Sequence, residues 1–240
     1  MRRKNMQNLN ELRIPTADSN LGEALNDFST FEISGADIRV VFRNFDLELE
    51  RFCAEFPVII GCVAWLTDEI FIDNLISKKV CILVQKEDFL RPDIGSSKSR
   101  LFSAYNKVPS RLQRYELPGI SSSLSVGGDP SVEPFRCVGN HNREKSPAFP
   151  RMHNKFLIGC SYHDGSEESC WEDAYIRPKS VWTGSYNITR NAQMSFENAV
   201  VIRSEAVASA YASEWSQVFA LSEPLDWESP WVLPEYRIGT

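Results

Sequence analysis

The sequence has no long apolar run. No window of its 240 residues approaches the roughly 18 consecutive apolar residues that a membrane-spanning helix requires. The N-terminal segment, residues 1–13, is polar and carries charges of both signs, which is unlike a secretory leader. A polybasic amphipathic helix of the kind that lies on a membrane surface is also missing. We therefore expect a chain without a membrane partner that is not secreted.

The sequence also lacks a closely spaced cysteine pair of the CxxC type. Its six cysteines are scattered along the chain. Cys53, Cys62 and Cys81 lie in strongly apolar segments, where a reduced thiol packs as a small hydrophobic group. This usage favours a reducing, cytoplasmic location.

A zinc site is the alternative interpretation of the remaining cysteines. Cys137 with His141, and Cys160 with His163, have the spacing of structural zinc ligands, and Cys170 follows nearby. The absence of CxxC and the position of these pairs beside a candidate catalytic strand weigh against zinc. We expect no metal and no cofactor.

An excess of positive charge is absent as well. The chain has 26 Lys and Arg residues against 32 Asp and Glu residues, a formal net charge of −6. Because phosphate binding needs positive potential, this balance argues against a protein that coats nucleic acid non-specifically. It does not exclude a local basic groove.

The sequence does contain a regular alternation of strand and helix patterns. A β-branched run at 38–42 is followed by helical spacing at 47–56, an apolar run at 58–65, a helix that begins at Thr67, and an apolar run at 80–84. Continuously apolar runs indicate strands that are covered on both faces. The order predicts an α/β sandwich with parallel pairing.

The second half is expected to complete a single domain. Residues 91–151 are rich in Ser, Gly and Pro and predict an irregular, loop-bearing middle. Further strands are expected near 132–138, 156–158, 180–182 and 199–202, and helices near 100–107 and over 204–221. The predicted organisation is an arm (1–36), a domain (37–221) and a tail (222–240) that packs on the domain or on a partner.

Three short blocks in the second half carry chemistry. His153-Asn154-Lys155 precedes an apolar strand, Gly184-Ser185-Tyr186-Asn187 follows, and Glu197-Asn198 precedes the last strand. In this order they resemble the phospholipase D superfamily, whose signature is HxKxxxxD with GSxN about a strand later and often a following EN. The segment 64–68 is similar to the single-motif bacterial endonucleases of that superfamily. The resemblance, over about residues 37–221, implies a phospholipase D-like α/β/α sandwich with a mixed, largely parallel sheet.

The resemblance implies a metal-independent phosphodiesterase, most simply a nuclease. Neutral imidazole is a nucleophile near pH 7, so His153 is the expected attacking group, and Glu197 is the candidate carboxylate that orients it. Lys155, Ser185 and Asn187 supply donors for the charge that develops on the phosphoryl oxygens. Lys155 shares a strand face with His153, because side chains alternate along a strand.

The eighth position of the motif departs from the family pattern. It is usually Asp and is Cys160 here, with Asp164 and Asp173 further along. In the family this Asp lies away from the attacked phosphorus, so the change threatens local architecture more than chemistry.

A single copy of the motif implies a dimer. In the superfamily the histidine of a second copy protonates the leaving oxygen, and this chain contains no internal duplication. We therefore expect a homodimer with its active site at the interface. Membership of a larger protein complex is a further expectation.

Basic residues of the middle segment are candidates for contact with nucleic acid, because they are interleaved with aromatic side chains. An ordinary solvated surface is the alternative. The candidates are Lys98, Arg100, Lys107, Arg111, Arg114, Arg143 and Lys145.

Two other functions compete with a nuclease. A phospholipid hydrolase would need an apolar, membrane-facing rim near the site. A catalytically weak nucleic-acid-binding subunit of a larger complex, for example in defence, would fit the Cys160 departure. Fold analogy alone cannot distinguish them.

Overall fold

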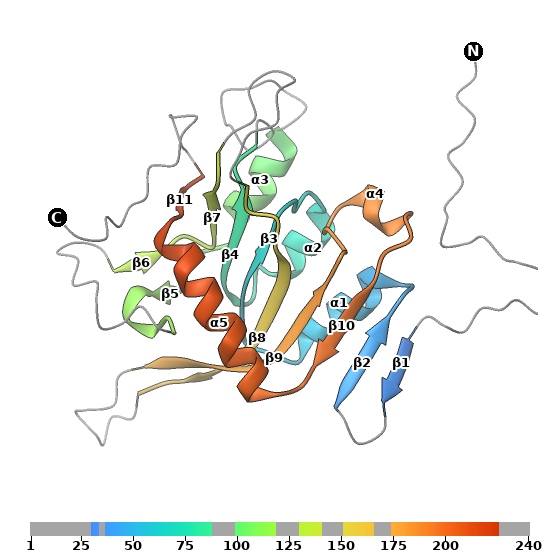
Figure 1. The fold of residues 1–240 in the computed structure, drawn as a ribbon. Coiled ribbons are helices and arrows are strands. Elements are labelled where there is room, and N and C mark those ends of the chain that lie inside the picture. Colours follow the sequence, from blue (N-terminus) through green and yellow to red (C-terminus); the bar gives the residue numbers. More distant parts are fainter. Residues whose placement is uncertain are drawn as a thin grey trace, which may run out of the picture.

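The computed structural model describes residues 30–33, 37–87, 99–118, 130–140, 151–165 and 174–225. Nine strands within these residues form one twisted sheet (Figure 1). From edge to edge they are β1 (Thr30–Ile33), β2 (Ile38–Val41), β10 (Ala199–Ile202), β9 (Tyr175–Gly184), β8 (Lys155–His163), β3 (Val58–Val63), β4 (Lys79–Gln85), β7 (Phe135–Val138) and β11 (Glu223–Pro224). A separate two-stranded sheet pairs β5 (Leu112–Gln113) with β6 (Ser131–Val132).

The mixed α/β sheet expected from the sequence is confirmed, but it is less parallel than expected. Among the described strands, β3 pairs in parallel with β4, and β4 with β7. The other pairings of the large sheet are antiparallel. The first predicted strand, β2, does not join β3; it lies near the far edge between β1 and β10. Order along the chain does not fix neighbours in a sheet, because a returning strand can insert between two earlier ones.

Helices cover both faces of the sheet, which gives the predicted sandwich. Figure 1 shows α5 (Glu205–Ala220) across one face, with α1 (Phe45–Ala54), α2 (Glu69–Asn74) and α3 (Ser99–Lys107) behind the other. Two apolar clusters fill the two layers. One joins α1, α2 and α3 to the sheet, and the other joins it to α5 through Trp215 and Phe219. Strands β3 and β4 contribute to both clusters, which explains why their sequences are continuously apolar.

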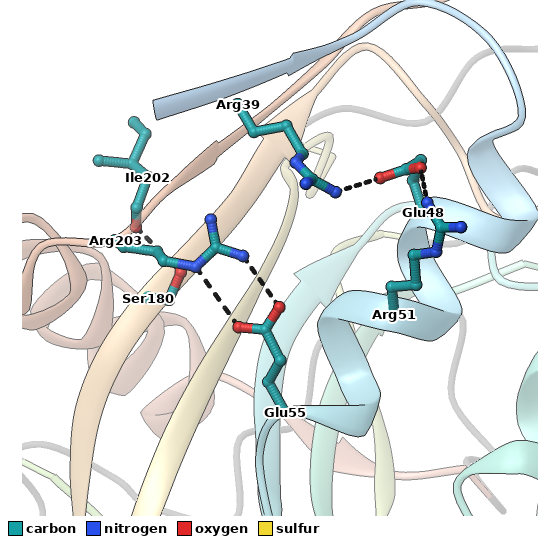
Figure 2. A network of polar contacts seen from close by, with 7 residues as sticks. All are labelled: Arg39, Glu48, Arg51, Glu55, Ser180, Ile202 and Arg203. Atoms are coloured by element: carbon teal, nitrogen blue, oxygen red, sulfur yellow. Dashed lines mark hydrogen bonds and ion pairs between the residues drawn. The ribbon is translucent and has the colours of Figure 1, made fainter. Parts of the chain in front are cut away.

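Ion pairs attach α1 to the sheet (Figure 2). Glu48 is buried and contacts Arg39 of β2 at 2.9 Å and Arg51 at 2.6 Å. Beyond the end of α1, Glu55 contacts Arg203 at 2.9 Å, directly after β10. A buried carboxylate needs such partners, because removing its charge from water without them is costly.

The caps of two helices test the predicted boundaries. The N-cap of α2 is Asp68, whose carboxylate accepts from the backbone N–H groups of Ile70 and Phe71, so the expected start at Thr67 is one residue early. Asp and Thr are both good caps, and sequence alone could not rank them. The N-cap of α5 is Ser204, as its predicted range implies.

Parts of the expected arm and tail belong to the sheet. Strand β1 falls within residues 1–36 and forms one edge, and β11 falls within residues 222–240 and pairs with β7. The rest of both segments, including Trp227 and Trp231, lies outside the described residues. No helix in the described ranges is long and apolar enough for a bilayer crossing.

Candidate active site

Four strand ends meet at one end of the sheet. The register places Val63, the last residue of β3, opposite Lys155, the first residue of β8. It also places Gly184, at the end of β9, opposite Ala199, at the start of β10. Residues that directly precede or follow these strands therefore gather at one edge. All five predicted catalytic residues lie there: His153, Lys155, Ser185, Asn187 and Glu197.

His153 and Lys155 are in direct contact. The Nζ atom of Lys155 lies 3.3 Å from both ring nitrogens of His153 and donates to the His153 carbonyl oxygen at 2.9 Å. The imidazole is exposed and Lys155 is half-buried. The predicted common orientation of the two side chains is therefore observed.

The surroundings of His153 favour its neutral form. Partial burial, followed by the positive charges of Lys155 and Arg151, lowers the pKa of His153 below its usual value of 6.5. Burial also lowers the pKa of Lys155, while the carboxylate of Glu197 opposes that shift. A neutral imidazole retains the lone pair that a nucleophile needs.

Trp65 packs beside this pair. Its ring lies edge-on to the His153 ring, with centroids 5.6 Å apart, and the Lys155 ammonium lies 6.0 Å from its centroid. The indole N–H donates to Glu87 at 3.3 Å. Ala64 separates Trp65 from the end of β3, and its N–H donates to the Asn154 carbonyl oxygen at 2.9 Å. The end of β3 thus supports both the backbone and the ring of the His153 segment.

Ser185 links the second and third sequence blocks. Its hydroxyl donates to Glu197 and accepts from the backbone N–H of Asn198 at 3.1 Å and from the Asn198 amide at 3.3 Å. The Oδ1 atom of Asn187 is buried and has no hydrogen-bond partner within the described part of the chain. The GSxN and EN blocks are therefore one polar unit rather than two separate motifs.

Glu197 does not orient His153 through a contact within the chain. Its carboxylate bonds to Ser185, whereas the ring nitrogens of His153 face Lys155. The expected carboxylate–imidazole contact is therefore absent between these two described residues. The spacing of the blocks predicted proximity, but it could not choose among the donors that compete for one carboxylate.

Two cavities flank the site. One, of about 480 Å³, is lined by His153 and Lys155 together with Tyr211 and Glu214 of α5. The other, of about 510 Å³, is lined by Asn187 and Glu197 together with Trp65. The predicted catalytic residues therefore lie between two open spaces.

Two of the predicted basic residues, Arg111 and Arg114, lie away from the site. Arg111 donates to the carbonyl oxygen of Ser77 at 3.0 Å, just before β4, whereas the other end of β4 adjoins the site through Gln85. Six residue steps of about 3.3 Å separate those ends by about 20 Å. Arg114 lies on the same remote side, 3.5 Å from the Ser131 carbonyl oxygen.

The other basic candidates are exposed or lie outside the described ranges. Arg100 is exposed on α3. Lys107 is also exposed and pairs with Asp73 at 3.0 Å. Lys98, Arg143 and Lys145 lie outside the described residues.

Cys160 is remote from the chemistry. It is fully buried in the apolar cluster under α5 and pairs in register with Val58, at the start of β3. Five residue steps along β8 separate it from Lys155, about 17 Å. The departure from the family motif therefore removes no polar group from the site.

The zinc alternative gains no support from the described residues. Cys137 and Cys160 are both buried, and no group of three or more His, Cys, Asp and Glu side chains gathers within the ranges that the structure covers. His141 and Cys170 lie outside those ranges.

Comparison with known proteins gives one relative by sequence. The chain is 30% identical over 217 residues to the uncharacterized protein L381 of Acanthamoeba polyphaga mimivirus, an alignment that covers 82% of this chain and 70% of that protein. The chain belongs to the L381 family. No established family model matches the sequence.

Three solved structures are similar in fold to this L381-family chain, and the sequence identity is low in each case. Nuc from Salmonella typhimurium, a phospholipase D family member, has a TM-score of 0.44 at 16% identity and covers 78% of this chain and 95% of its own. NucT from Helicobacter pylori has a TM-score of 0.47 at 11% identity, with 75% and 94% covered. The archaeal chromatin protein TrmBL2 has a TM-score of 0.39 at 14% identity, with 78% and 54% covered.

Sequence reasoning missed several residues at the site of this L381-family chain. Trp65 and Glu87 follow the ends of β3 and β4, and Tyr211 enters the site from α5, where its spacing predicted only a core position. The sequence signal that could have found them is a polar or amphipathic residue just after the end of a buried strand. This signal identifies candidate site residues. It does not show which of them contact each other, because the contacting residues are far apart in the sequence.

Proposed function

We propose that this chain is a metal-independent phosphodiesterase that hydrolyses the DNA or RNA backbone through a phosphohistidine intermediate. The contact between the Lys155 ammonium and the His153 imidazole, 3.3 Å, carries the proposal. It places a neutral nucleophile beside a fixed positive charge. That pairing suits attack on an anionic phosphodiester.

The first step forms a bond between an imidazole nitrogen of His153 and phosphorus and breaks the bond to the leaving oxygen. The Lys155 ammonium, with the amide of Asn187 nearby, neutralises the charge that grows on the non-bridging oxygens. In the second step water attacks the phosphohistidine and restores the free imidazole.

The leaving oxygen needs a proton that this imidazole cannot give while it is the nucleophile. The proposal therefore includes a homodimer in which the His153 of a second copy, as the imidazolium, gives that proton and, once neutral, takes the proton of the attacking water in the second step. Glu197, held by Ser185, opposes the lowering of the pKa of Lys155 by burial and so favours the charged form of that lysine. No metal enters either step.

The buried position of Cys160 favours an active enzyme over a catalytically weak binding subunit. The substitution lies in the core under α5, so the groups that the chemistry uses are all present. A phospholipid hydrolase is less well supported, because charged side chains line both flanking cavities: Lys155 and Glu214 in one, Glu87 and Glu197 in the other. Hydroxyl, amide and charged side chains line much of both.

The direct test is cleavage of labelled single- and double-stranded DNA and RNA in EDTA. We expect cleavage by the wild-type protein and a loss on the order of 10³-fold or more in His153→Ala, the size typical of removing a nucleophile. His163→Ala is the matched control, because His163 lies at the other end of β8 against Tyr175. An alkaline quench in single turnover should trap phosphorus on His153.

Two further readouts separate the alternatives. Adding excess His153→Ala protein to the wild type should suppress turnover if subunits exchange and share a site, whereas an unshared site predicts no suppression. Release of a lipid headgroup without strand cleavage would replace the nuclease by a phospholipid hydrolase. Nucleic-acid binding without turnover of either substrate would support the alternative in which the chain is a catalytically weak nucleic-acid-binding subunit.

A further inference from the structure

The cavity beside Trp65 differs in character from the His153 side of the site. We define the Trp65 cavity by six of its lining residues, Trp65, Thr67, Glu87, Asn187, Asn191 and Glu197. Its volume of about 510 Å³ is within the range of small-molecule sites. Two of the predicted catalytic residues, Asn187 and Glu197, line it, and neither lines the cavity that contains His153 and Lys155. A group held there would adjoin a phosphate bound at His153.

The aromatic wall of this cavity is fixed before any ligand arrives. The indole N–H of Trp65 is tied to Glu87, a carboxylate that is 9% exposed, and its ring packs against His153. A rigid aromatic surface loses little conformational entropy on binding a flat partner. Trp65 is therefore suited to stacking.

The charges of the Trp65 cavity exclude a second phosphate. No Lys or Arg lines it in the described part of the chain, and its two charged residues are Glu87 and Glu197. An anion would meet two carboxylates and no cation. The hydroxyl of Thr67 and the amide of Asn191 instead offer hydrogen bonds to a neutral ligand.

We propose that the Trp65 cavity binds the nucleobase next to the scissile phosphate. This inference rests on the proposed nuclease function and deepens it. A base supplies a flat face for Trp65 and an edge of neutral donors and acceptors for Thr67 and Asn191. An acyl chain would meet hydroxyl, amide or carboxylate groups on most of the lining residues, and a choline group favours several aromatic rings where the described cavity has one.

Binding by a protein that cannot turn over tests the inference without relying on cleavage. The background is the full chain with His153→Asn, which keeps a planar polar group beside Trp65. The probes are fluorescent oligothymidylate and the matching chain built of abasic residues, compared by anisotropy at one salt concentration. Adding Trp65→Ala should weaken oligothymidylate on the order of tenfold and leave the abasic chain unchanged, as loss of base stacking predicts.

Two further variants guard against an effect of misfolding. Trp65→Phe should restore most of the affinity for the base-bearing chain. Thr67→Val keeps the shape of the side chain and removes its hydroxyl, and it should weaken the base-bearing probe alone. The inference is overturned if the variants weaken the binding of both probes equally, or the binding of neither. It is also overturned if glycerophosphocholine competes with the base-bearing probe and thymidine does not. Absence of cleavage by the wild type, with base-dependent binding intact, would instead defeat the proposed function alone.

Discussion

The side-chain oxygen of Gln85 accepts a hydrogen bond of 2.7 Å from the backbone N–H of Met152, one residue before His153. The same amide donates to the carbonyl oxygens of Asn140, at 2.8 Å, and Lys86, at 3.1 Å. Gln85 is 1% exposed. One buried side chain at the end of β4 thus holds the backbone at Asn140 and at Met152. It therefore fixes the position of the chain directly before His153.

Replacing Gln85 by Leu should cost both stability and activity. The change removes the hydrogen bonds to the Met152 N–H and to the carbonyl oxygens of Asn140 and Lys86, and a buried group left unpaired costs about 1–3 kcal/mol. We expect a loss of about 2–5 kcal/mol in the free energy of unfolding, measured with urea, and a clear fall in kcat. Gln113→Leu, on remote β5, is the control and should reduce stability without reducing kcat. An unchanged kcat in the folded Gln85→Leu protein would contradict a role in positioning His153.

The pKa of His153 should respond to its cationic neighbours. Burial and the charges of Lys155 and Arg151 lower this pKa below 6.5, so neutralising either cation should raise it toward the usual value. NMR titration can follow the ring directly, because the chain has only three histidines. We expect a larger rise in Lys155→Gln than in Arg151→Gln, and an acid limb of kcat/KM in the wild type that lies below pH 6.5. A downward shift in either variant would show that another group sets this pKa.

The sequence allowed much of the fold to be predicted, for physical reasons that particular elements illustrate. Strands β3 and β4 and helix α5 were predictable because burial of one or both faces dictates their apolar pattern. The position of β2 was not, because its four residues fit a sheet edge as well as the centre. Register and neighbour choice depend on partners distant in the chain.

The site was predictable as a set of residues but not as a network. The blocks around His153, Ser185 and Glu197 do meet, because each adjoins the end of a strand on the same edge. Distances of a few ångströms decide which donor bonds to the Glu197 carboxylate, and that donor is the Ser185 hydroxyl. Gln85 and Trp65 act through backbone and ring contacts that no sequence pattern encodes.

Placing at position 160 the Asp of the phospholipase D motif that the sequence resembles should harm the protein. Cys160 is fully buried among apolar side chains, and burial raises the pKa of its thiol. An Asp there would be stable only when protonated, because its pKa in the folded state would exceed the unfolded value. We expect Cys160→Asp to lose about 3 kcal/mol or more at pH 8 and less at pH 5, by urea unfolding. Cys160→Ala should lose less and show no such pH dependence, and a Cys160→Asp protein as stable as wild type at pH 8 would refute the assignment of this position to the core.

Ser185 and Glu197 should act as one unit in catalysis. The Ser185 hydroxyl donates to the Glu197 carboxylate while accepting from the Asn198 N–H, so removing the hydroxyl releases the carboxylate that opposes the lowering of the pKa of Lys155. Ser185→Ala and Glu197→Gln should each lower kcat/KM, and the double variant should be little worse than Glu197→Gln alone. Such non-additivity, measured as a double-mutant cycle, is the signature of residues in one network. If the two losses multiply instead, Ser185 works independently of Glu197, by contacting the phosphoryl group itself.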